Sequence, residues 1–141
     1  MPLAAGYRII AHTADVGISA WGADLGAALA AAGRALFSLT VDLRTVRRRQ
    51  ERDIEVSAAD REGLVIAWLS ELIYLFDTEH LLLRHFEINE ITDIRLSTRA
   101  YGEKVNPARH HLKTAVKAAT YHQLRVAGDD NGCRVRVILD I

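Results

Sequence analysis

Two segments of the chain repeat their apolar side chains at the three- to four-residue spacing of an amphipathic helix. The first begins at Asp24, a residue type that caps helices, runs to about position 38, and is otherwise rich in alanine. The second spans about 59 to 76 and carries Trp68 within a broad apolar stripe. We therefore expect two main helices, and we interpret Trp68 as a core anchor rather than a platform for base stacking.

Short apolar or alternating runs, bounded by glycine, proline or polar clusters, predict strands. They cover positions 7–11, 16–21, 53–57, 82–91, 94–101, 114–126 and 133–141. The last two form a predicted hairpin around a turn at 128–132. In the final strand Cys133 shares one face with aliphatic residues, whereas the other face carries Arg134, Arg136, Ile138 and Asp140.

The 141 residues, 15.7 kDa in mass, contain no internal repeat, linker or low-complexity tract, and they fit one domain covering 1–141. The order of helices and strands predicts an α+β fold, a two-layer sandwich of mixed or antiparallel sheet with two main helices. With half of its residues hydrophobic, the chain is not expected to be disordered.

The net charge of the chain limits the kinds of partner that it can bind. Lys plus Arg and Asp plus Glu each number 18, so the formal net charge is zero, and any contact with RNA is expected to be local or indirect. A basic run at 44–52 holds five arginines (Arg44, Arg47, Arg48, Arg49 and Arg52). Because no aromatic residues are interleaved, we favour a solvated loop leading into an edge strand over an RNA-binding patch. The run remains a candidate partner surface.

The chain carries few signals of compartment or of standard catalysis. A single cysteine, Cys133, cannot form an internal disulfide, and no long apolar run or basic leader opens the chain. We expect a cytoplasmic protein without membrane contact. The usual nucleotide-loop, hydrolase and zincin motifs are missing, and His110 and His111 would point to opposite faces of a strand. No complete catalytic set can be assembled.

The carboxylates near the chain end are the exception. Asp140 is followed by Ile141 with its α-carboxylate, and Asp15 lies in the bend between the first two strands. If the bend lies near the chain end, three carboxylates meet. Such an oxygen-only cluster suits Ca²⁺, Mg²⁺ or Mn²⁺. The ordinary alternative, a frayed and solvated terminus, is favoured by composition alone.

Four elements spread over essentially the whole chain resemble the archease family in order and spacing. They are His12-Thr13-Ala14-Asp15-Val16-Gly17-Ile18, Ala20-Trp21-Gly22, Val116-Lys117-Ala118-Ala119-Thr120-Tyr121-His122 and Leu139-Asp140-Ile141. The resemblance implies a non-catalytic cofactor protein of the RtcB-type RNA ligase of tRNA splicing and RNA repair. Family members promote the ligase's GTP-dependent guanylylation and so permit multiple turnover.

The resemblance also implies roles for single residues. A divalent ion would be held by Asp15, Asp140 and Ile141, and Lys117 matches the family's functionally important lysine. With Lys117, we expect His12 and Thr120 at the partner contact. RNA would then be met only indirectly, through the ligase. The oligomeric state is not fixed by the sequence, and a monomer is compatible with it.

Two other classes of function stay open. A chaperone or specificity modulator of tRNA-modifying enzymes, such as an RNA methyltransferase, could dock through the basic run at 44–52. A metal-dependent phosphohydrolase could use the same carboxylates, but the sequence offers it no evident nucleophile or base, so it ranks last.

Overall fold

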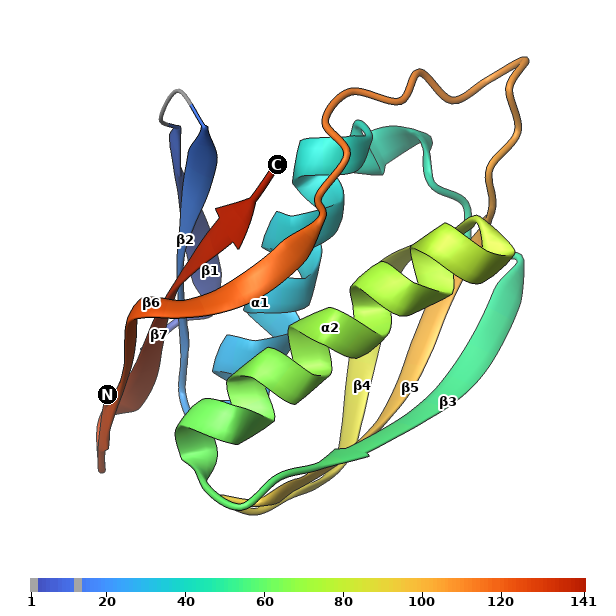
Figure 1. Ribbon diagram of the computed structural model, residues 1–141. Coiled ribbons are helices and arrows are strands. Elements are labelled where there is room, and N and C mark those ends of the chain that lie inside the picture. The colour runs from blue at the N-terminus through green and yellow to red at the C-terminus, as the bar shows by residue number, and fades with distance from the viewer. Residues whose placement is uncertain (1–2, 12–13) are drawn as a thin grey trace.

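The computed structural model describes residues 3–11 and 14–141. Seven strands, two long helices and one short helix follow one another along this chain (Figure 1). In order they are β1 (Gly6–Ala11), β2 (Asp15–Gly22), α1 (Leu25–Thr40), the short 3-10 helix η1 (Leu43–Thr45), β3 (Gln50–Ser57), α2 (Arg61–Glu79), β4 (Leu81–Ile91), β5 (Arg95–Lys104), β6 (Ala118–Asp129) and β7 (Gly132–Asp140).

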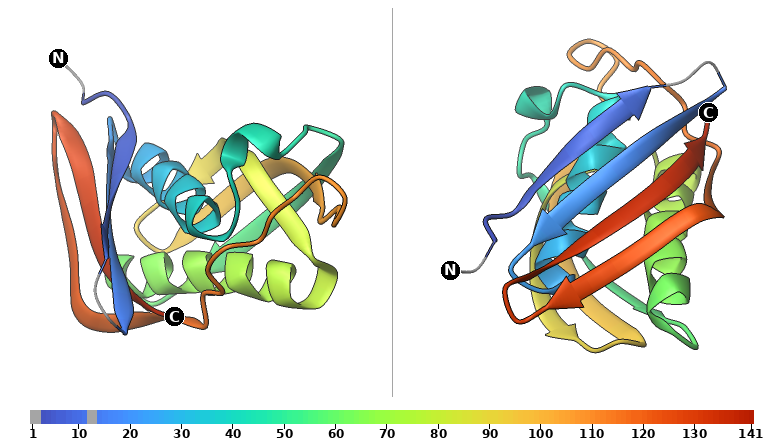
Figure 2. Two further views of the ribbon diagram at one scale, coloured as in Figure 1. Left: turned by 90° about the horizontal axis from the view of Figure 1, so that it is seen from above. Right: turned by 90° about the vertical axis from the view of Figure 1, so that its left-hand side faces the viewer.

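The strands form two sheets. One has the order β1-β2-β7-β6 and the other β3-β5-β4, and every neighbouring pair is antiparallel. Both helices lie between the two sheets (Figures 1 and 2). The predicted α+β class with two main helices is confirmed, and the pairing, left open between mixed and antiparallel, is antiparallel. The expected two layers are three, because the helices form a middle layer between the two sheets. The outer face of the four-stranded sheet is left without a helical cover (Figure 2, right).

An aspartate caps the start of each helix, and for α1 it is Asp24, as predicted. The Asp24 side chain accepts a hydrogen bond from the backbone N–H of Ala27 at 2.8 Å, and that of Asp60 accepts one from Gly63 at 2.7 Å. Each bond satisfies an N–H group that the first helical turn leaves without a partner. Short polar side chains therefore set the starting points of α1 and α2.

Trp68 joins three elements at the centre of the core. Its side chain is fully buried, and its indole N–H donates to the backbone oxygen of Leu29 on α1 at 2.8 Å. Its ring stands edge-on to Phe86 of β4, with the centroids 5.5 Å apart. The prediction that Trp68 is a core anchor is confirmed.

The predicted start of the hairpin at position 114 was wrong, because β6 begins at Ala118. The backbone N–H groups of Lys113 and Thr114 bond instead to the carbonyl oxygens of Thr40 and Leu39, at 2.8 and 3.1 Å. These carbonyls at the end of α1 have no partner within the helix, so the incoming chain caps the helix and cannot yet pair with a strand. The predicted alternation of the last strand is confirmed, with Cys133 on its buried face.

Neither helix, along the part of the chain that the structure describes, has both the length and the apolar character needed to cross a membrane.

Candidate functional site

The early bend and the end of the chain meet on the four-stranded sheet. In the register of β2 with β7, Asp15 lies directly opposite Asp140. Directly opposed residues of an antiparallel pair have Cβ atoms roughly 4.5–5.5 Å apart, on the same face of the sheet. Two carboxyl groups from positions far apart in sequence are therefore held side by side, next to the terminal residue Ile141.

One oxygen of this pair has a buried position without a partner. Asp15 is partly buried, and its Oδ1 atom is shielded from solvent with no hydrogen-bond partner among the described residues. A buried carboxylate oxygen that is not compensated is costly, the more so beside a second carboxylate. A hard cation would compensate both, because Ca²⁺, Mg²⁺ and Mn²⁺ prefer oxygen ligands. The donors at this end of the sheet therefore fit a divalent ion.

Among the residues that the structure describes, no third side chain joins the two aspartates as a metal ligand. Within residues 3–11 and 14–141, no three His, Cys, Asp or Glu side chains gather closely enough to hold a metal ion. Ile141 follows Asp140 directly, and its terminal carboxylate is an oxygen donor of the kind that such an ion prefers.

The strand β6 brings Lys117 to the same end. The backbone N–H of Lys117 donates to the carbonyl oxygen of Asp140 at 2.8 Å, and Ala118 is the strand partner of Asp140. Lys117 itself is exposed. The Thr120 hydroxyl donates to the carbonyl oxygen of Ile138 at 2.9 Å, so it tightens the pairing of β6 with β7. His12, predicted at the same contact, lies outside the described residues.

A bulge follows Thr120 and exposes an aromatic ring. Thr120 pairs with Ile138 and Arg125 with Arg136, so four residues of β6 face a single residue of β7. Gln123 takes a left-handed backbone conformation there, with φ at 53°. Tyr121, at the start of the bulge, is 63% exposed. Strand alternation gave no signal for this, because the bulge interrupts the alternation.

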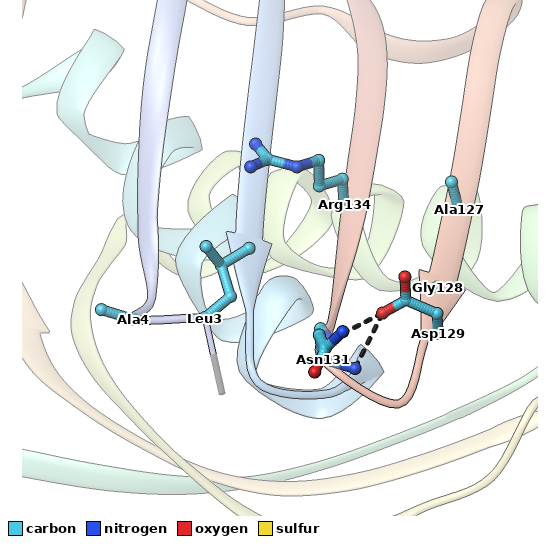
Figure 3. A pocket seen from close by; sticks show the side chains of 8 residues that line it. Leu3, Ala4, Ala127, Gly128, Asp129, Asn131 and Arg134 are labelled. Atoms are coloured by element: carbon cyan, nitrogen blue, oxygen red, sulfur yellow. Dashed lines mark hydrogen bonds between the residues drawn. The ribbon is translucent and has the colours of Figure 1, made fainter. Parts of the chain in front are cut away.

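A hollow of about 510 Å³ lies at the opposite end of the β6–β7 hairpin (Figure 3). Leu3, Ala127, Asp129 and Arg134 are among the residues that line it. The Asp129 carboxylate already has partners there, because it accepts hydrogen bonds from the backbone N–H groups of Asn131 and Gly132 at 2.8 and 3.2 Å. The hollow and the aspartate pair are therefore separate features.

Most of the basic run at 44–52 is engaged within the chain. Arg44 binds Asp42 at 2.8 Å, and this hydrogen bond lowers the pKa of Asp42 to about 2. Arg52 binds Glu79 at 2.7 Å through a two-pronged contact. The end of the run enters β3, which lies at the edge of its sheet and confirms the predicted edge strand. Arg48 stacks 3.7 Å from the ring centre of Tyr101.

The remaining candidates for chemistry are structural. Cys133 is buried, and burial raises the pKa of its thiol, which disfavours the thiolate needed for nucleophilic attack. His110 is buried beside Glu103, with 3.2 Å between His110 Nε2 and Glu103 Oε2, whereas His111 is exposed. The two adjacent histidines lie in the segment between β5 and β6 and not on a strand, and they are held in different surroundings.

Comparison with known proteins gives one consistent result. The sequence model of the Archease protein family matches residues 7–141. The chain is 34% identical to protein archease of Sulfolobus acidocaldarius over 136 residues, which cover 96% of this chain and 98% of that protein. It is 42% identical to protein archease of Pyrococcus furiosus over 118 residues, or 82% of this chain and 83% of the relative.

Two solved structures share the fold. The solution structure of Methanobacterium thermoautotrophicum protein 1598 is 34% identical, has a TM-score of 0.81 and covers 96% of this chain and 99% of that one. The crystal structure from Thermotoga maritima of an archease, described as a possible chaperone, has a TM-score of 0.63 and covers 95% and 96% of the two chains. At 19% identity, the second likeness concerns the fold alone.

Proposed function

The chain belongs to the archease family, and from this premise we propose that it is a helper protein of an RtcB-type RNA ligase. In this proposal it promotes the GTP-dependent guanylylation of the ligase in tRNA splicing and RNA repair, without itself joining RNA. The observation that carries the proposal is the pairing of Asp15 with Asp140 beside the chain end.

The aspartate pair suits a role at a nucleotide site of another protein. Asp15, Asp140 and the carboxylate of Ile141 would hold the divalent ion, with the buried Asp15 Oδ1 atom as one donor. Such an ion supplies neutralisation of the negative charge that develops on a triphosphate. The chain's own contribution is rigidity, because every residue of β2 is paired with β7, and this pairing fixes the two aspartates relative to each other.

Lys117 would act next to this pair. Its backbone is tied to Asp140 while its side chain is exposed, so the ammonium group is free to meet a phosphate or a carboxylate of the ligase. The backbone hydrogen bond to Asp140 fixes the backbone of Lys117, which limits the conformational entropy that is lost when the side chain contacts the ligase.

Removing a carboxylate of the pair should abolish most of the activation. We expect Asp140→Asn, and a chain lacking Ile141, to lower the stimulated rate of ligase guanylylation about tenfold or more, because metal affinity depends steeply on the ligand set. The measurement is transfer of labelled GMP from GTP to a purified RtcB-type ligase, with and without this protein. The matched control is Asp130→Asn, an exposed aspartate in the turn at the other end of the hairpin.

Circular dichroism should first show that every variant is folded. Full stimulation by Asp140→Asn and by the shortened chain would reject the metal-carboxylate proposal. Equal loss in Asp130→Asn would show that the effect is not specific to this end of the sheet.

Lys117 can be tested in the same assay. Lys117→Met keeps most of the aliphatic stem and removes the charge, and we expect stimulation to fall about tenfold, in line with loss of one charge-assisted contact. Lys113→Met, in an exposed lysine of the preceding segment, is the control. Unchanged stimulation by Lys117→Met would contradict the proposed contact.

A chaperone or specificity modulator of a tRNA-modifying enzyme, such as an RNA methyltransferase, is the second candidate. What motivates it is the description of another archease, that of Thermotoga maritima, as a possible chaperone. Under this alternative the protein would raise the soluble yield or the site selectivity of the methyltransferase and leave ligase guanylylation unchanged. The two assays run in parallel therefore separate the candidates, and incubation with GTP alone tests for a hydrolase.

A further inference from the structure

The outer face of the four-stranded sheet gathers positive charge from distant parts of the sequence. Arg8 lies opposite Ser19, Ser19 opposite Arg136, and Arg136 opposite Arg125, so one row across all four strands carries three arginines. Arg134 follows on β7, two residues before Arg136, on the same face. We call these four residues, Arg8, Arg125, Arg134 and Arg136, the arginine face. Because Cys133, Val135 and Val137 of β7 are buried towards the helices, the arginines lie on the opposite side of the sheet, which no helix covers (Figure 2, right).

The arginine face is exposed and is not neutralised internally. All four side chains are exposed, and none forms an ion pair within the described part of the chain. The other sheet differs, because there Arg95 binds Glu55 and Arg99 binds Asp53, each at 2.9 Å. Like charges directly opposite each other, as in Arg125 and Arg136, disfavour strand pairing. A bound anion would remove this repulsion.

The surface around the arginines has room for such an anion. A hollow of about 370 Å³ is lined by Gln123, Leu124, Arg125 and Arg136. Arg134 lines the hollow of about 510 Å³ described above, at the turn end of the β6–β7 hairpin. Its side chain extends towards β2 (Figure 3). The guanidinium of Arg134 lies 5.6 Å from the ring centre of Trp21. The Trp21 ring stands over Gly6, where an added Cβ would come within 3.0 Å of it. Planar groups of this kind can stack against bases.

The geometry points to a single-stranded RNA whose phosphodiester backbone crosses the arginine face. Arginine presents a planar fork of donors that matches phosphate oxygens. The positions run across the sheet, so they fit a chain of several phosphates. An acidic protein surface fits less well, because protein interfaces have an apolar centre, whereas nucleic-acid interfaces are more polar and more positive. The arginine row holds only polar side chains, with Ser19 as its fourth member, and the apolar Ile10 and Ile138 lie beside Gly17 in the next row, towards the aspartate pair.

The carboxylates of this face lie at its two ends. Asp15 and Asp140 are at one end and Asp129 at the other, so a strand crossing in the middle avoids them. The zero net charge of the chain does not reveal that the arginines are concentrated on this face, because it sums the charges of all faces. This inference extends the proposed function, in which RNA was met only through the ligase, and it does not depend on it.

Binding of a short, fluorescein-labelled oligouridine to the purified protein tests the inference by fluorescence anisotropy over a series of salt concentrations. One phosphate contact from each of the three arginines in the row (Arg8, Arg125 and Arg136) should give a slope of log affinity against log salt of about −2. In the double variant Arg125→Gln with Arg136→Gln, we expect affinity to fall at least about tenfold and the slope to lose about 1.4. No ligase is present, so the result is independent of the activation assay.

The matched control is the double variant Arg95→Gln with Arg99→Gln, which removes the same charge from the other sheet. Unchanged affinity in this control, with the loss confined to the Arg125 and Arg136 variant, supports the inference. Absence of binding, or equal loss in both variants, overturns it. Equal affinity for a polyglutamate peptide of the same charge would assign the face to an acidic protein and would also overturn it.

Discussion

Replacing Gly102 by alanine is expected to destabilise the fold by about 3 kcal/mol or more, the upper part of the range for overpacked sites. A Cβ atom at this position would lie 1.8 Å from the carbonyl oxygen of Leu82 and 2.9 Å from the Cα atom of Leu83. These are backbone atoms of β4, so no change of rotamer relieves the clash. Gly102 also pairs with Gln50 of β3, on the other side of the central strand β5.

The measurement is the midpoint and slope of urea unfolding, followed by circular dichroism. A loss of this size is a large part of the 5–15 kcal/mol of total stability of an ordinary domain. The matched control is Gly17→Ala, where the nearest contact of the added Cβ is an ordinary 3.5 Å from the side chain of Ile138. We expect the control to stay within about 1 kcal/mol of the wild type. Equal stability of the two variants would contradict the argument from close approach.

Local signals predicted the helices. Asp24 and Asp60 stand at their starts, and the apolar stripe of α2 placed Trp68 in the core. These features depend on neighbours three or four residues away, which the sequence shows directly. The position of Asp15 relative to Asp140 could not be predicted in this way, because the sequence does not show whether the bend lies near the chain end. Their contact depends on the strand order β2-β7, which joins the two ends of the chain.

The features that the sequence analysis missed depend on pairing between distant segments. The close approach of β4 to Gly102 is set by an irregular register after Leu83. The arginine face requires the register of four strands, because Arg8 and Arg125 are more than a hundred residues apart in sequence. The true start of β6 depends on carbonyl groups at the end of α1. None of these follows from periodicity within one segment.

The substitution Glu103→Gln is expected to cost about 3–5 kcal/mol of stability, the range for breaking a buried ion pair from one side. Glu103 is 4% exposed, and its carboxylate binds the Arg109 guanidinium and the backbone N–H of Arg47, the latter at 2.6 Å. Arg109 also donates to the carbonyl oxygen of Thr45. The cluster thus ties the segment that leads to β6 onto η1, and the substitution leaves a partly buried guanidinium without its counter-charge.

The same carboxylate gives a pH dependence whose sign can be stated. Burial alone would raise the pKa of Glu103, but the hydrogen bonds from Arg109 and from the Arg47 backbone, with their charges, bring the pKa below its usual value. The unfolded chain therefore takes up a proton first as pH falls, so stability from this group is present above about pH 4.5 and is lost below it. In Glu103→Gln this part of the acid dependence should be missing.

Urea unfolding at a series of pH values measures both effects. The matched control is Glu55→Gln, whose side chain is 62% exposed in its ion pair with Arg95, and it should change neither the midpoint nor its acid dependence measurably. The two variants should differ because the Glu103 cluster is buried and holds the chain at Arg109, so breaking it lowers the stability of the folded state. The exposed pair of Glu55 with Arg95 is screened by solvent and contributes little. A Glu103→Gln variant as stable as the control, with an unchanged acid slope, would show that this carboxylate does not secure the segment before β6.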